Sequence, residues 1–489
     1  MTGPNNTLRL CMPIPAQIIG YQRAFIQVES GRMRMVDHTS FKESSNLLSE
    51  QSVSRTVWSL ALPSMVAALV QTLNSFLDRM FVGSLGPDAL AAVGVGGQLV
   101  FLVMTLAMAV STGATAIVAR MVGAGDHANL QHAARQSLGI ALLLGLVMTA
   151  LGYWGLPLII SWYRLEAGAF AQARQFLMPA LLGTPGLFLM MGLMGTFRGL
   201  GDTRSPMIAS IVATLVHLAG DWVLIFGRYG FPRMEIQGAG IALALSMWVG
   251  AGVLWGLQVV RSRKLAAPAL PRWQWVWRIL RIGIPASMRT LIYSTSSIMF
   301  TMILAATAAG TAAVAALPIG LTAESIAFMP GFAFAIAASA LVGQALGAKN
   351  ERLAERFGWM ASWQACAVMS AMAVVFFVFA EPFARWFTRD PQVIELAVAY
   401  LRINALSEPL LAFGLVLAGA LQGAGDSLKA MLASFVVQWV VRLPLAWLLA
   451  FGLGLDANGA WWAMALSSMF SGLLFIVLFK RGGWKSARV

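Results

Sequence analysis

The sequence predicts an all-α polytopic membrane protein with twelve transmembrane helices in two pseudo-symmetric six-helix lobes. Hydrophobic residues fill 58% of the 489 positions and charged residues only 11%, which excludes an ordinary soluble globular protein. The apolar stretches run for about 20 residues or more, as membrane helices require, whereas barrel strands alternate over about ten. The two halves of the chain also resemble each other. A helical bundle built from a parallel repeat is therefore expected.

Residues 1–50 are polar and irregular, and we expect them to form a poorly ordered cytoplasmic tail. Pro13 and Pro15 interrupt their short apolar run, so a signal-peptide core of the usual length is not found. Met33 and Met35 are candidate alternative starts of the chain.

Apolar spans follow the tail to near the end of the chain. They cover residues 57–82, 89–121, 132–160, 170–197, 206–227, 238–260, 279–307, 311–345, 354–380, 394–421, 429–452 and 459–480. The connection between the sixth and seventh spans is basic and contains three tryptophans, which favour the headgroup region. It predicts a cytoplasmic linker that leads into an interfacial helix. The expected organisation is a tail at 1–50, an N-terminal lobe at 51–260, a linker at 261–278, a C-terminal lobe at 279–480 and a cytoplasmic tail at 481–489.

The Lys and Arg residues predict the orientation of the spans. With the N-terminus inside, most of them fall in the tails and inner loops, and the linker alone holds Arg261, Arg263, Lys264 and Arg272. The outer loops hold Arg164, Arg174, Arg228, Arg233, Arg385 and Arg389. Because cytoplasmic loops carry the excess of positive charge, both termini are expected inside, in a bacterial inner membrane. This distribution explains the net charge of +14 without nucleic acid.

The repeat is visible in the sequence itself. MGTFRGLGDTRSPMIAS at 194–210 matches AGALQGAGDSLKAMLAS at 418–434, and at the same offset Gly123 falls on Gly347. Because each half has an even number of spans, the two copies share one orientation about an axis along the membrane normal. The cleft between them is the expected transport path.

Two carboxylates within spans are the first candidates for function, because a charge at the bilayer centre costs roughly 2.5–3.5 kcal/mol by insertion scales. Asp78 and Asp221 each precede the outer end of a span by roughly 8–9 Å, so they can meet at one level. His217, four residues before Asp221, shares its helix face. Two such carboxylates cannot both ionise cheaply, so one is expected to hold a proton that a helix movement releases. The alternatives are outer-interface positions for both acids and a packing role for His217.

The repeat supports a dedicated ion site. Its alignment places Phe300 opposite Asp78 and Ala446 opposite Asp221. Acids needed only for packing would have been kept in both copies, so their presence in one lobe favours ion coupling.

Further residues are candidates for a substrate cavity, where polar groups and adaptable Met and Phe side chains suit varied aromatic cations. They are Gln71, Asn74, Glu324, Glu408, Met190, Met194 and Phe328. For the Met and Phe residues, packing against neighbouring helices is the alternative. Arg289 and Arg442, with Glu324 and Glu408, either form structural ion pairs, of which Glu408–Arg442 is one case, or attract cationic substrates.

Several motifs are missing from the sequence. It contains neither G-x-x-x-x-G-K-[ST] nor H-E-x-x-H, so nucleotide hydrolysis and metalloenzyme chemistry are not expected. Cys11 and Cys366 are too few for a disulfide framework or a metal cluster. The protein is thus predicted to be no enzyme, to use no cofactor and to draw on an ion gradient.

The sequence resembles the multidrug and toxic compound extrusion (MATE) family over about residues 52–480. The likeness rests on Leu62-Pro63, Asp78–Gly83, Arg198–Thr203 and the segment 324–348. It implies a secondary multidrug exporter with two six-helix lobes, driven by inward flow of H⁺ or Na⁺. The family's ion-coupling Asp on the first helix corresponds to Asp78.

The resemblance also bears on the coupling ion. Proton-linked members of the DinF-like branch carry an Asp on the fifth helix, matched by Asp221, and an Asn one turn earlier, where His217 stands. Some sodium-linked members carry acids on the seventh and tenth helices, where this chain has Tyr293 and Leu411. Their C-terminal sodium site is therefore expected to be absent, and H⁺ is the expected ion, with Na⁺ as the alternative.

The resulting hypothesis is a monomeric antiporter in the lipid bilayer that exports small amphipathic organic cations by alternating access. The alternative is a flippase for a lipid-linked precursor, since related two-lobed folds move such cargo.

Overall fold

The computed structural model describes residues 28–29, 32–33, 50–162 and 166–487. The chain divides into two units, residues 1–53 and 54–489. In the first unit, β1 (Val28–Glu29) pairs antiparallel with β2 (Arg32–Met33). Met35 and most of the predicted tail lie outside the described residues.

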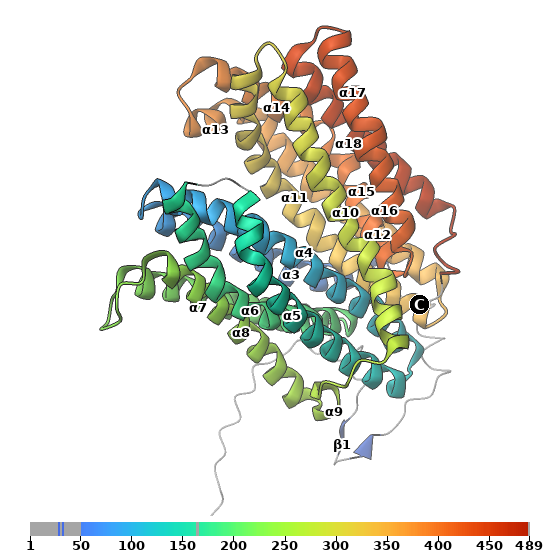
Figure 1. Ribbon diagram of the computed structural model, residues 1–489. Helices are drawn as coiled ribbons and strands as arrows, with labels where there is room; N and C mark the ends of the chain where they lie inside the picture. The colour runs from blue at the N-terminus through green and yellow to red at the C-terminus, as the bar shows by residue number, and fades with distance from the viewer. Residues whose placement is uncertain (1–27, 30–31, 34–49, 163–165, 488–489) are drawn as a thin grey trace, which may run out of the picture. The chain divides into compact units, whose positions relative to one another are not determined.

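The second unit is helical, and its two halves form separate bundles that are blue to green and yellow to red in Figure 1. The first half contains α3 (Glu50–Gly83), α4 (Pro87–Ala124), α5 (His127–Trp162), α6 (Ala167–Gly199), α7 (Arg204–Phe226) and α8 (Glu235–Arg261), and the short α9 (Arg263–Ala266) follows. The second half contains α10 (Trp273–Ala305), α11 (Gly310–Gly347), α12 (Glu351–Val378), α13 (Ala380–Phe387), α14 (Pro391–Ala405), α15 (Glu408–Gly423), α16 (Ser427–Phe435), the π-helical η1 (Val436–Arg442), α17 (Leu443–Trp447), the π-helical η2 (Leu448–Gly452) and α18 (Asp456–Lys480).

Among the described residues, ten helices are long and apolar enough to cross a membrane, and the number is eleven when the bent pair α14 and α15 is counted as one span. The predicted seventh span of the chain lies in α10. This helix is less apolar than those ten helices, and it contains Arg278, Arg281 and Arg289. An all-α protein with two six-helix lobes is therefore confirmed.

Two spans differ in detail from the sequence prediction. The expected continuous span 394–421 is bent by 60° between α14 and α15. Pro409 lies in the first turn of α15, where its missing N–H and its restriction on the preceding residue end the α14 helix. The tryptophans of the linker do not form a separate interfacial helix, because they occupy the first turns of α10.

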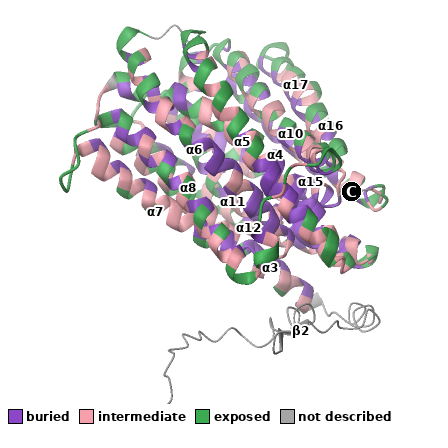
Figure 2. Ribbon diagram, turned by 60° about the horizontal axis from the view of Figure 1, so that its bottom comes forward, coloured by how far each residue is buried: buried purple, intermediate pink, exposed green. Residues whose placement is uncertain are grey.

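Glycines bring the central helices of each lobe together, where the buried residues gather around α4, α6, α11 and α15 (Figure 2). A Cβ on Gly195 would lie 2.4 Å from the Ser111 oxygen, and one on Gly419 would lie 2.5 Å from the Ala335 oxygen. Gly199 and Gly423 repeat this contact one turn later. The two G-x-x-x-G motifs thus allow close helix packing in both lobes.

The two lobes meet along α4, which packs against α10 and α11. The Ser287 hydroxyl of α10 donates to the Thr105 carbonyl of α4 at 2.7 Å. Gly283 of α10 lies against the Ala109 carbonyl, because a Cβ there would approach its oxygen to 2.0 Å.

Candidate ion-coupling site

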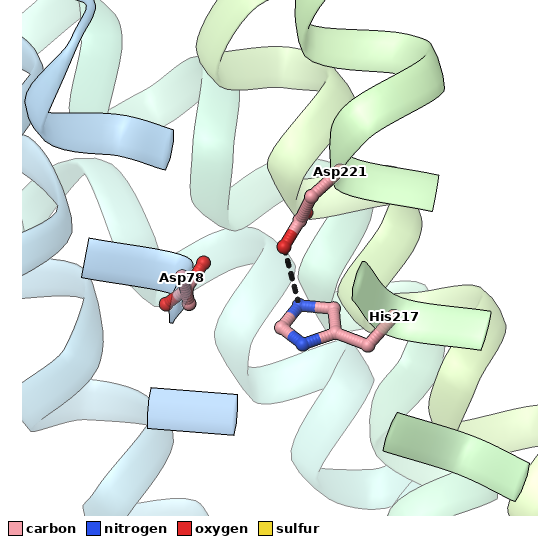
Figure 3. A group of neighbouring side chains, drawn as sticks. All are labelled: Asp78, His217 and Asp221. Carbon is pink, nitrogen blue, oxygen red and sulfur yellow. Dashed lines mark ion pairs between the residues drawn. The ribbon is translucent and has the colours of Figure 1, made fainter. Parts of the chain in front are cut away.

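Two helices of the N-terminal lobe present acidic residues near their ends. Asp78 lies five residues before Gly83, the last residue of α3. Asp221 lies six residues before Gly227, whose left-handed conformation (φ 67°) ends α7. Figure 3 shows both carboxylates and the His217 ring facing one another. The predicted meeting of these three side chains is therefore confirmed.

The three side chains form a compact, largely buried cluster. One oxygen or nitrogen atom from each lies within 4.8 Å of the others. The His217 Nε2 atom is 3.6 Å from Asp221 Oδ2. Asp221 is fully buried and His217 nearly so, whereas Asp78 is half-buried. This geometry suits a proton, or a small cation that oxygen ligands bind.

Asn74 orients the histidine. Its Oδ1 atom lies 3.1 Å from His217 Nδ1, and an amide oxygen only accepts, so Nδ1 carries a hydrogen in this arrangement. The opposite nitrogen, Nε2, faces Asp221. A proton bound to the Asp221 carboxyl or to Nε2 would lie between these two residues, and its loss leaves a carboxylate facing a ring nitrogen that has no hydrogen.

Asp221 lacks the usual partners of a buried carboxylate. Neither of its oxygens has a hydrogen-bond partner within the described part of the chain. Burying an ionised carboxylate without compensation is costly, so the group is stable there only with a bound proton or cation. The cluster can therefore bind and release one positive charge.

The predicted cavity residues are spread over both lobes. Gln71 is exposed on α3. Met190 and Met194 are buried in the core of the N-terminal lobe with Leu138 and Leu254, an arrangement that favours packing in this conformation. Phe328 of α11 stacks on Phe332, with ring centroids 6.2 Å apart.

A small cavity of about 20 Å³ in the C-terminal lobe is lined by Glu324, Glu408 and Asn404. The Tyr400 hydroxyl donates to Glu324. Glu408 is 4% exposed, and its Oε2 atom has no hydrogen-bond partner among the described residues. Tyr400 is not among the residues predicted from the sequence, although a tyrosine within an apolar span was an available signal.

The Glu408–Arg442 ion pair that was considered from the sequence is not formed among the described residues. Arg442 instead donates through Nε to Ser467 at 2.8 Å and through Nη2 to Ser468 at 3.0 Å. Both serines belong to α18, so the guanidinium is held by neutral hydroxyls. Its charge still acts on the Glu324 carboxylate.

Comparison with known proteins agrees with this repeated architecture. The MatE family model matches residues 63–223 and 285–448, once in each lobe. The chain belongs to the MATE family. It is 34% identical over 437 residues to the "Probable multidrug resistance protein NorM" of Thermotoga maritima, covering 88% of this chain and 93% of that protein. A protein of the same name from Burkholderia pseudomallei is 30% identical over 436 residues, covering 86% and 91%.

Solved structures show the same fold. The outward-facing conformation of a multidrug resistance MATE family transporter superimposes with a TM-score of 0.81 at 25% identity, covering 89% of this chain and 97% of that one. MATE in the straight conformation gives the same values. This MATE protein is therefore a multi-pass membrane transporter for multidrug efflux and not an enzyme.

Proposed function

We propose that this MATE protein is a secondary active exporter that couples the inward flow of H⁺ to the export of small amphipathic organic cations. Asp78, Asp221 and His217 are the ion-coupling residues. The observation that carries the proposal is the buried Asp221 carboxylate, which has no hydrogen-bond partner among the described residues and lies beside a histidine and a second acid.

The coupling follows from charge. Deprotonation of Asp221 leaves a buried negative charge on α7, which is stable only if water or a cation enters the site. Protonation removes this charge and allows α3 and α7 to pack closely. A proton entering from outside and leaving inside therefore changes the packing of the N-terminal lobe in each cycle. The bound drug favours the opposite cleft orientation, and the two steps alternate.

The test is transport by purified protein in lipid vesicles. A fluorescent organic cation is offered under a proton gradient alone and then under a sodium gradient alone, with wild type and Asp78→Asn in parallel. We expect the proton gradient to drive transport by wild type and not by the variant, because the amide keeps the shape and cannot exchange a proton. Near-normal transport by Asp78→Asn would refute the proposal, whereas transport driven only by sodium would keep the site and change the ion.

The orientation belongs to the same proposal. We place the protein in the bacterial inner membrane with both termini in the cytoplasm, because the basic residues gather in the tails and inner connections. Reporter fusions after Lys264 and at the C-terminus should both give cytoplasmic signals. An external signal at either point would contradict this orientation.

A lipid-linked precursor flippase remains the competing function. A transport path lined with arginine would favour it, since such cargo is anionic. Glu324 and Glu408, which are candidates for the substrate cavity, line a cavity of the C-terminal lobe, and these acids support a cationic cargo instead.

A further inference from the structure

The two lobes touch through a reciprocal contact at the ends of α4 and α11. A Cβ on Gly123 would lie 1.9 Å from the Gln344 carbonyl oxygen, and one on Gly347 would lie 2.2 Å from the Arg120 carbonyl oxygen. Gly123 and Gly347 hold the same position in the two repeats, and so do Arg120 and Gln344. Each helix end therefore places a glycine against the same backbone group of its counterpart, as in a two-fold symmetric interface.

The side chains of these counterparts extend the contact. The Arg120 Nη2 atom donates to the Ala424 carbonyl at 3.0 Å, at the end of α15. The Gln344 Nε2 atom donates to the Gly199 carbonyl at 2.9 Å, at the end of α6. Carbonyls at a helix end lack intrahelical donors and carry partial negative charge, so they suit an arginine or an amide.

The turns that follow α6 and α15 match in both lobes. Gly201 and Gly425, at equivalent repeat positions, have φ angles of 83° and 91°, which favour glycine. After each turn, an aspartate forms an ion pair with a nearby basic side chain. Asp202 pairs with Arg261, and Asp426 pairs with Lys429. The repeated Gly-x-Gly-Asp motif thus fixes the carbonyls that the opposite lobe binds.

Arg120 has an additional partner that Gln344 does not share. Its Nη2 atom also donates to the Ala487 carbonyl at 3.0 Å. The segment 482–487 is fixed to the C-terminal lobe, because Trp484 is 1% exposed and stacks on Phe479 with centroids 4.6 Å apart. Lys485 Nζ lies 2.8 Å from Glu355 Oε1. One arginine of the first lobe therefore holds two segments of the second.

We propose that Arg120 and Gln344 are positioning residues for alternating access. Their bonds to Gly199, Ala424 and Ala487, which we call the clasp, hold this end of the lobes together and have to break before the lobes part there. Arg120 is the stronger arm because its bonds are charge-assisted and number two. Its Nε atom is buried without a hydrogen-bond partner among the described residues, a penalty that opening relieves. The clasp therefore stabilises the closed arrangement of this end but still allows the lobes to separate there.

The clasp can be tested by measuring the distance between the lobes. Ala128 and Arg352 are exposed at equivalent positions near the starts of α5 and α12, so Ala128→Cys and Arg352→Cys place one spin label on each lobe. Cys11 and Cys366 are replaced by Ser. Pulsed electron spin resonance on the purified protein in lipid nanodiscs then gives the distance distribution.

Arg120→Ala should raise the ratio of long to short distances by about a hundredfold, because it removes two charge-assisted hydrogen bonds that are each worth about tenfold. Gln344→Ala should raise it by only about threefold, because its bond is neutral. Truncation after Arg481 removes the Ala487 partner and should fall between these two variants.

Two control variants separate positioning from general stability. Arg204→Ala removes an equal charge from an exposed site at the start of α7 and should leave the distances unchanged. Arg120→Lys keeps the charge and should restore most of the short distances. Unchanged distances in both Arg120→Ala and Gln344→Ala would overturn the clasp, even if these variants melted earlier. Because this measurement needs neither gradient nor substrate, its failure would leave the proposed coupling site untouched.

Discussion

Where the N-terminal lobe carries Asp78 and Asp221, the C-terminal lobe carries Phe300 and Ala446, both in an apolar core. Phe300 packs against Trp461, with ring centroids 6.3 Å apart. The glycines that allow close helix packing, in contrast, are present and crowded in both lobes. The packing of the repeat thus needs the glycines and not the acids, and the acids serve a task that only one lobe performs.

In the C-terminal lobe, the environment of Glu324 differs from that of Asp221. Glu324 accepts a hydrogen bond from Tyr400, and the Arg442 charge acts on it. Asp221 of the N-terminal lobe has only the half-buried Asp78 and His217 beside it. Glu324 thus has a hydroxyl donor, whereas neither Asp221 oxygen has a hydrogen-bond partner among the described residues, so Asp221 depends on a mobile ion.

The largest expected effect is the loss of transport when the acids of the N-terminal lobe are removed. Asp221→Asn should reduce gradient-driven export to near background, as is expected for Asp78→Asn. The double variant should be little worse than either single one, because groups that act as a unit are not additive. Vesicle transport rates of the three variants measure this, with surface expression as the check on folding.

Phe300→Leu is the matched control for that comparison, because it changes the Asp78 position of the other lobe. It should reduce export far less than Asp78→Asn. If Phe300→Leu abolished export as completely as Asp78→Asn, the inference that only the N-terminal lobe couples the ion would be wrong.

The sequence predicts the parts of the fold that depend on local chemistry. Span length, the even division of the chain and the depth of Asp78 and Asp221 all follow from apolar runs and helix ends. The G-x-x-x-G contacts could also be predicted, because small residues at that spacing have few other roles in membrane helices. The clasp could not, since Arg120 and Gln344 bind backbone carbonyls, which carry no side-chain signature.

A second prediction concerns the glycines at the lobe interface. Gly123→Ala would place a methyl 1.9 Å from the Gln344 oxygen, so the backbones have to separate, at a cost of about 1–3 kcal/mol. Gly94→Ala, in the same helix with open space around its Cβ, should be neutral or stabilising by up to about 1 kcal/mol. Thermal unfolding in detergent compares the two, and equal melting temperatures would mean that the interface is looser than described.

Partners within the C-terminal lobe were the hardest to predict. Arg442 and Glu408 are the kind of opposite charges that a sequence analysis pairs, yet the serines of α18 compete for the guanidinium. Serine in a membrane helix usually bonds to its own backbone, so its availability depends on helix rotation. Side-chain pairing between distant helices is set by that rotation, which apolar patterns do not specify.

The smallest expected effect is the coupling energy between Arg442 and Glu408, which tests that pairing directly. Arg442→Ala should destabilise the protein by about 1.5–3 kcal/mol, the worth of hydrogen bonds from a charged group, and Glu408→Ala should cost little because Oε2 has no partner to lose among the described residues. The two losses should add within about 0.5 kcal/mol, because the groups share no bond. Denaturant unfolding in mixed micelles gives the three free energies. Glu324→Gln combined with Arg442→Ala is the positive control, and it should deviate from additivity because the Arg442 charge acts on Glu324. A coupling energy between Glu408 and Arg442 as large as that between Glu324 and Arg442 would contradict this expectation. The arginine charge would then act on both acids of the C-terminal cluster, and both would differ from Asp221.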